Sequence, residues 1–151
     1  MSTSEPDFIV VVKKDCPTCM LVEPVIAELQ ATGQSIHIWS QDDPGFPALA
    51  DNVGDDRDLQ QSWQLNIETV PTVIRMDNDA ESERTVGWDR AEWLRLFDVP
   101  SLGASLPDFR PGCGSMSVAP GMPEKLALKY GDIALQSRRI DIGEMEDPME
   151  S

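Results

Sequence analysis

The fold is decided by residues 8–19, FIVVVKKDCPTC. Residues 8–12 are a continuous run of apolar, mostly β-branched side chains, typical of a strand buried on both faces in the centre of an α/β sheet. The apolar residues that follow recur at positions i, i+3, i+4 and i+7, which predicts an amphipathic helix up to Gly33. They are Val22, Val25, Ile26 and Leu29. Pro24 lies inside this helix and should bend its axis.

The two cysteines at the start of this helix have the placement of a redox-active dithiol. A helix N-terminus presents unpaired N–H groups and a partial positive charge, which stabilise a thiolate and lower its pKa. Cys19 lies one turn further along, where it can attack a mixed disulfide formed at Cys16. We therefore predict Cys16 as the attacking nucleophile and Cys19 as the resolving thiol.

The hydrophobic pattern continues to alternate between strands and helices. Further strands are expected at residues 35–40, 72–76 and 84–86, the last returning antiparallel after turn residues 77–79. Further helices are expected at residues 46–53, with Pro47 at the first helical position, at residues 58–65, and after Asp89 as far as Phe97. The predicted class is α/β, with a sheet flanked by helices.

Composition changes after residue 99. Residues 100–123 contain five Pro and four Gly, which marks a boundary or a long functional loop. A short helix is expected at residues 124–130, and residues 140–142 suggest a strand. The predicted organisation is a flexible N-terminus (1–7), an α/β domain (8–99), a Pro/Gly-rich C-terminal extension of unknown role (100–142) and an acidic, disordered tail (143–151).

The charge balance excludes several classes of partner. The 151 residues include 12 Lys and Arg against 27 Asp and Glu, a formal net charge of −15. Nucleic-acid binding and attraction to an anionic membrane surface both need clustered cations, so neither is expected. No apolar run approaches the ~18 residues of a membrane span. Residues 1–7 lack the basic region and cleavage site of a signal peptide, so we expect a cytoplasmic protein.

Four features in combination resemble the thioredoxin superfamily. They are the buried strand, Cys16-Pro17-Thr18-Cys19, Pro24 five residues after the second cysteine, and Val70-Pro71-Thr72 before a strand. The resemblance runs from Phe8 to about Phe97 and implies a thioredoxin-like fold with a central mixed sheet, in its minimal, glutaredoxin-like form. It also implies a cis bond before Pro71, with Pro71 facing the dithiol. In that family the residue before this proline, here Val70, lends backbone hydrogen bonds to the substrate chain.

Several positions depart from the family pattern. No aromatic residue stands directly before Cys16, Val10 stands where typical thioredoxins carry a buried Asp, and His37 takes the place of a Lys near the dithiol. His37, the only histidine, has two interpretations. It could accept the proton of Cys19 as an accessory base, or it could be a strand residue that faces solvent.

Cys113 lies between Gly112 and Gly114, which allow close approach of the backbone to another group. It is either a third redox thiol on a mobile arm that exchanges with Cys16, or an ordinary loop residue. The three cysteines and His37 could in principle form a Cys₃His zinc site. Because only one Cys-x-x-Cys is present, we predict no metal site.

The favoured function is a thiol–disulfide oxidoreductase that exchanges the Cys16/Cys19 dithiol with a protein or small-molecule disulfide. It would need no cofactor beyond this redox-active disulfide, and an upstream thiol reductant would be its second partner. The alternative is a thioredoxin-fold binding or adaptor module with little redox activity, which would hold a partner against Pro71. The dithiol favours the first, whereas the acidic surface and the long C-terminal region favour the second.

Overall fold

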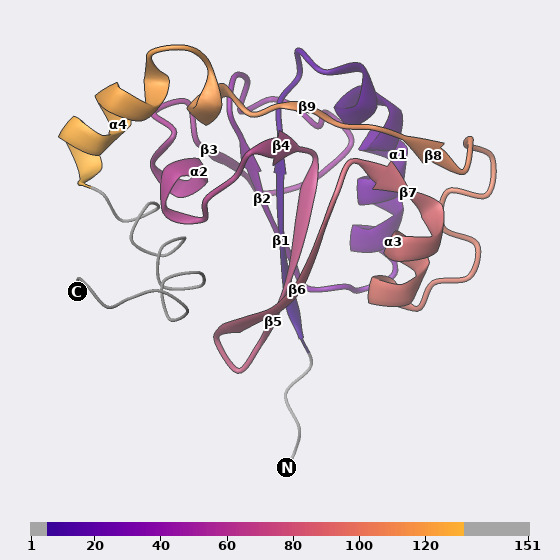
Figure 1. Ribbon diagram of the computed structural model, residues 1–151. Helices are drawn as coiled ribbons and strands as arrows, with labels where there is room; N and C mark the ends of the chain where they lie inside the picture. The colour runs from indigo at the N-terminus through magenta and orange to yellow at the C-terminus, as the bar shows by residue number, and fades with distance from the viewer. Residues whose placement is uncertain (1–5, 132–151) are drawn as a thin grey trace, which may run out of the picture.

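A computed structural model describes residues 6–131 of the chain. Its central sheet has five strands in the order β3-β2-β1-β5-β6 (Figure 1). Strands β1, β2 and β3 run parallel, β5 runs antiparallel to β1, and β6 antiparallel to β5. The sheet is therefore mixed. The strand bounds are β1 Asp7–Val12, β2 Ile36–Ser40, β3 Val53–Asp55, β5 Thr72–Asp77 and β6 Ala80–Val86.

The predicted central strand is β1, which lies between β2 and β5. Val10 is opposite Ile38 on one side and Val73 on the other, and it is completely buried. Val11 and Val12 are also completely buried. The apolar run thus forms a strand covered on both faces, as its composition predicts. It ends where the chain turns toward the two cysteines.

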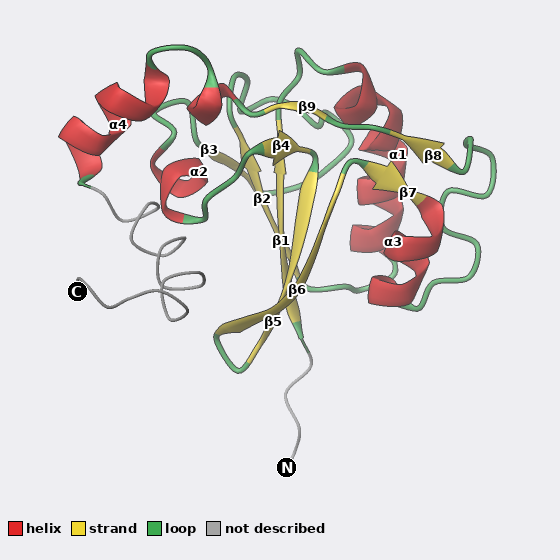
Figure 2. Ribbon diagram, viewed as in Figure 1, coloured by secondary structure: helices red, strands yellow, loops and turns green. Residues whose placement is uncertain are grey.

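Helices cover both sides of the sheet (Figure 2). α1 (Pro17–Ala31) and α3 (Arg90–Phe97) lie on one side, and α2 (Gln60–Gln64) and α4 (Met122–Tyr130) on the other. The rings of Phe8 and Phe97 are 4.3 Å apart between centroids, joining β1 to α3. A second apolar cluster, made of Leu59, Trp63 and Leu126, joins α2 to α4. The chain after residue 99 thus supplies one of the covering helices.

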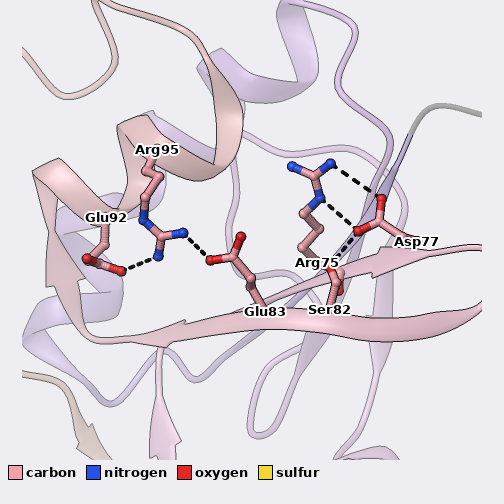
Figure 3. Close-up of polar contacts among 6 residues, drawn as sticks. All are labelled: Arg75, Asp77, Ser82, Glu83, Glu92 and Arg95. Carbon is pink, nitrogen blue, oxygen red and sulfur yellow. Dashed lines mark hydrogen bonds and ion pairs between the residues drawn. The ribbon is translucent and has the colours of Figure 1, made fainter.

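Ion pairs on the surface link β6 to α3 (Figure 3). Arg95 on α3 pairs with Glu83 on β6 and with Glu92 on its own helix. Arg75 pairs with Asp77 along β5, with the nitrogen and oxygen atoms 3.0 Å apart. These side chains are partly exposed, and such pairs each contribute about 0–1 kcal/mol. Of these pairs, Arg95–Glu83 joins two elements, whereas the other two lie within α3 and within β5.

The helix predicted at residues 46–53 is wrong. This segment is irregular and leads into β3. The Glu23 carboxylate accepts the N–H of Ala48 at 2.6 Å, and the Gln30 amide bonds both the N–H and the carbonyl of Asp51. In a helix the Asp51 N–H would donate to the Pro47 carbonyl, so the Gln30 side chain here takes the place of a helical hydrogen bond.

Residues 100–131 are built into the domain. β7 (Trp88–Asp89) pairs with β8 (Phe109–Arg110), and β4 (Thr69–Val70) pairs with β9 (Cys113–Gly114). We call residues 109–117 the strap. A 3₁₀ turn, η1 (Met116–Val118), leads from the strap into α4.

The helix expected at residues 124–130 is α4, which begins at Met122 and ends at Tyr130, with Gly131 as its C-cap. The strand suggested at residues 140–142 and the tail 143–151 lie outside the described residues, as do residues 1–5. β1 begins at Asp7, inside the segment expected to be flexible. Within residues 6–131, no helix has the length and apolar character needed to cross a bilayer.

Candidate active site: three cysteines at one sheet edge

Three cysteine sulfurs meet beyond the end of β1. Cys16 is the N-cap residue of α1, and its Sγ accepts the backbone N–H of Cys19 at 3.2 Å. The Sγ of Cys113, 97 positions further along the chain, lies 2.7 Å from the Sγ of Cys16. All three cysteines are free thiols in this structure. The fold therefore joins Cys113 to the predicted dithiol.

The surroundings of Cys16 favour its thiolate form. The pKa of Cys16 is lowered from 9.0 to about 5, and a hydrogen bond from the Cys19 thiol makes the largest contribution. The Cys113 thiol and the backbone N–H groups of Cys19 and Thr18 act in the same direction, and burial opposes them. Hydrogen bonds to the charged form stabilise it, so Cys16 is ionised at neutral pH.

The other two cysteines stay protonated beside this thiolate. Cys19 is completely buried, and burial raises its pKa well above the usual value, with a further rise from the hydrogen bond it gives to Cys16. Burial and the contact with Cys16 also raise the pKa of Cys113. One negative charge thus rests on Cys16, with a thiol donor on either side.

Val70 and Pro71 border the thiolate. The Val70–Pro71 bond is cis, and the Val70 carbonyl oxygen lies 3.8 Å from the Cys16 Sγ. Val70 belongs to β4, whose partner strand is β9, and it lies directly opposite Cys113. The strap therefore occupies the backbone edge that the family resemblance reserves for a substrate chain.

Side chains on both sides of the dithiol hold the strap in place. The Thr18 hydroxyl, inside the Cys-x-x-Cys motif, donates to the Pro111 carbonyl at 2.6 Å and accepts from Arg110 Nε at 3.0 Å. Lys13 Nζ donates to the Gly114 carbonyl at 2.8 Å. These contacts fix the backbone on either side of Cys113.

Gly112 lets the strap lie close against β4. A Cβ added at Gly112 would be 2.5 Å from the Val70 carbonyl oxygen and 3.2 Å from the Cα of Gly87. Gly87 has φ +73°, and a Cβ there would be 2.9 Å from the Gly112 backbone nitrogen. Two glycines thus meet where a larger residue would push the strap away. By contrast, a Cβ at Gly114 would meet nothing within 4 Å.

A buried polar network anchors the far end of the strap. The Gln41 amide nitrogen donates to the hydroxyls of Ser62 and Ser115 at 2.8 and 2.7 Å. Ser62 in turn donates to the carboxylate of Asp56 at 2.6 Å, and the hydroxyls of Ser115 and Ser117 are 2.7 Å apart. No buried side-chain nitrogen or oxygen in the described part of the chain is left without a partner. Sequence reasoning missed this network, because its members are polar residues in predicted loops and short helices.

His37 is not part of the site. It is the second residue of β2, opposite Ile9, with an exposed side chain. No hydrogen bond joins His37 to a cysteine among residues 6–131, so the solvent-facing interpretation replaces that of an accessory base. Within the same residues, no group of three or more ligating side chains is arranged to hold a metal ion. The Cys₃His alternative therefore has no support in the geometry.

Comparison with known proteins identifies the fold. No family model and no curated protein matches the sequence. The crystal structure of StoA from Bacillus subtilis matches with a TM-score of 0.50 and 13% identity, over 65% of this chain and 85% of that one. A secreted Mycobacterium tuberculosis disulfide oxidoreductase homologous to E. coli DsbE matches with a TM-score of 0.50 and 15% identity, over 62% of this chain and 81% of that one. With its mixed sheet and flanking helices, the chain has a thioredoxin-like fold.

Proposed function

We propose that this protein is a thiol–disulfide oxidoreductase in which Cys16 is the nucleophile and Cys19 the resolving thiol. The observation that carries the proposal is the placement of Cys16 as the N-cap of α1, where its Sγ accepts the Cys19 N–H at 3.2 Å. The hydrogen bonds at this position lower the pKa of Cys16 to about 5. Thiolates, not thiols, attack disulfides, and a depressed pKa supplies the thiolate at neutral pH. A buried cysteine kept only for packing has no such donors around it.

The reaction has two exchange steps. The Cys16 thiolate attacks one sulfur of the substrate disulfide, forming a Cys16 mixed disulfide and releasing the other sulfur as a thiolate that takes up a proton. Cys19 then loses its proton and attacks the Cys16 Sγ, which forms the Cys16–Cys19 disulfide and releases the second substrate thiol. An upstream thiol reductant returns the enzyme to the dithiol by the reverse exchanges.

The substrate is a protein or small-molecule disulfide, which would meet Cys16 beside Val70 and Pro71 after displacing the strap from that edge. We further propose that the enzyme works in the cytoplasm, without a metal or cofactor and without a nucleic-acid or membrane partner. The alternative of a pure binding module receives less support, since it gives no role to a Cys16 sulfur surrounded by hydrogen-bond donors that lower its pKa.

A disulfide-reduction assay tests the proposal. The native chain should reduce insulin disulfides in the presence of dithiothreitol well above the uncatalysed rate. Cys16→Ser should abolish this activity, and the double variant Cys19→Ser, Cys113→Ser, which keeps no second thiol beside Cys16, should accumulate mixed disulfides at Cys16. Met20→Ser is the matched control, because Met20 follows the motif directly but is 55% exposed. Its activity should equal that of the native chain. A native chain with no activity above background would refute the proposal and favour the binding module.

A further inference from the structure

We propose that Cys113 is a third redox-active thiol, which resolves mixed disulfides at Cys16 by forming an internal Cys16–Cys113 disulfide. This inference rests on the proposed function and adds a catalytic residue to it. Cys113 directly contacts the reacting atom, with 2.7 Å between the two sulfurs. It is also the only one of the three cysteines with appreciable exposure.

The position of Cys113 is built into the fold. β9 pairs with β4 in a register that sets Cys113 opposite Val70. Before Cys113, Gly112 allows the close approach, and after it, Lys13 holds the Gly114 carbonyl at 2.8 Å. Because the backbone is fixed on both sides, Cys113 needs no search through solvent to reach Cys16. A reacting group held in this way has a high effective concentration.

The chemistry balances without any group beyond an external disulfide, for which we take glutathione disulfide. The Cys16 thiolate attacks this disulfide, so that Cys16 becomes glutathionylated and one glutathione leaves. Cys113 then loses its proton and attacks the Cys16 Sγ. A bond forms between Cys16 and Cys113, the bond to glutathione breaks, and the second glutathione leaves with that proton. Two protein thiols are oxidised, and one glutathione disulfide is reduced to two glutathiones.

Cys19 and Cys113 then compete for the same mixed disulfide. Cys19 is completely buried, whereas Cys113 lies on the strap at the surface side of Cys16. The two internal disulfides can also interconvert without an oxidant. Attack of Cys113 on the Cys16 Sγ releases Cys19, which takes up the proton that Cys113 gives up.

The decisive experiment counts glutathione released by the reduced full-length chain after addition of glutathione disulfide. In Cys19→Ser, Cys113 is the remaining resolving thiol, and about two glutathiones should be released per chain. In the double variant Cys19→Ser, Cys113→Ser, release should stop at about one, with a stable mixed disulfide at Cys16. Peptide mapping should find Cys16 joined to Cys113 in the first protein only.

Two glycine variants test the role of the strap geometry. In the Cys19→Ser chain, Gly112→Ala should slow the second release at least about tenfold, since its Cβ would meet the Val70 carbonyl. Gly114→Ala, two residues away, should leave it unchanged, because its Cβ meets nothing.

The possible results separate this inference from the proposed function. If the native chain releases two glutathiones but Cys19→Ser stops at one with Cys113 recovered as free thiol, Cys113 is not redox-active and only this inference fails. If the native chain releases none, the proposed function fails, and the inference with it. Should Cys19→Ser not fold, mapping of the oxidised native chain decides. A Cys16–Cys113 cross-link supports the proposal, and wholly free Cys113 overturns it.

Discussion

Cys16 should make the stability of the reduced chain depend on pH, and comparison with Cys16→Ser isolates this contribution. The pKa of Cys16 is about 5 in the folded chain, against an ordinary value of 9.0. Between these pH values the unfolded chain binds one more proton than the folded chain, so stability rises with pH. The stabilisation is fully present above about pH 9 and is lost as the pH falls through about 5.

The size of the effect follows from the width of this window. Each pH unit inside it adds about 1.4 kcal/mol to the free energy of unfolding, so a change from pH 6 to pH 8 should add about 3 kcal/mol. Serine at position 16 does not titrate. Cys19 and Cys113, whose pKa values are raised, stay almost entirely protonated across this range. Groups common to both proteins cancel in the difference.

Urea unfolding with a phosphine reductant, at pH 6 and at pH 8, measures this difference. The free energy of unfolding of the native chain should increase relative to that of Cys16→Ser between the two pH values. The gap between the native chain and Met20→Ser should stay constant, because Met20 neither titrates nor contacts the thiolate through a hydrogen bond. If the gap to Cys16→Ser is the same at both pH values, Cys16 is not an ionised thiol stabilised by the fold.

Four further substitutions test the site. Cys113→Ala removes one thiol donor, so the midpoint of the pH profile for Cys16 alkylation should rise by about one unit, and an unshifted midpoint would contradict the contact. Thr18→Val removes the hydroxyl that joins α1 to the strap and should speed Cys16 alkylation at neutral pH several-fold; an unchanged rate would mean that the strap is held without it. Gln41→Ala should lower the free energy of unfolding by about 2–4 kcal/mol in urea titrations, since it removes two hydrogen bonds to buried hydroxyls and leaves the Met116 N–H without its acceptor, and a loss below about 0.5 kcal/mol would count against the network. His37→Ala should leave disulfide reduction unchanged, whereas a large fall with an altered pH profile would return the histidine to the site.

Local sequence patterns were sufficient to predict most of the helices and strands. The apolar run of β1 and the 3.6-residue period of α1 each depend on residues that are neighbours in the sequence. The turn between β5 and β6 is equally local, because Asn78 and Asp79 both adopt positive φ, as a tight hairpin requires. The Asp89 carboxylate caps α3 by accepting the backbone N–H of Glu92, only three residues later, at 3.4 Å. Where the determinants are this close, periodicity and capping rules predict the structure.

The errors concern long-range contacts. Residues 46–53 have a helical period, but the Glu23 and Gln30 side chains, more than twenty positions away, bond the backbone of this segment instead. The glycines beside Cys113 indicate that the backbone lies close to another group, but they do not indicate which group that is. Only the pairing of β9 with β4 sets Cys113 opposite Val70. Register between segments so far apart in the chain follows from tertiary packing, which no local pattern encodes.

The strap changes the chemistry of the Cys-x-x-Cys motif without altering its residues. Cys113 on the strap adds a hydrogen-bond donor to Cys16, and the strap also covers Cys16, which is only 1% exposed. Because Cys16 is already ionised at neutral pH, a still lower pKa would add almost no thiolate and would reduce its nucleophilicity. The rate of reaction with an external disulfide is then limited by how accessible the Cys16 sulfur is. It depends on how firmly Thr18 and Gly112 keep the strap against α1 and β4. The reactivity of this dithiol is therefore governed by contacts made about ninety residues after the motif.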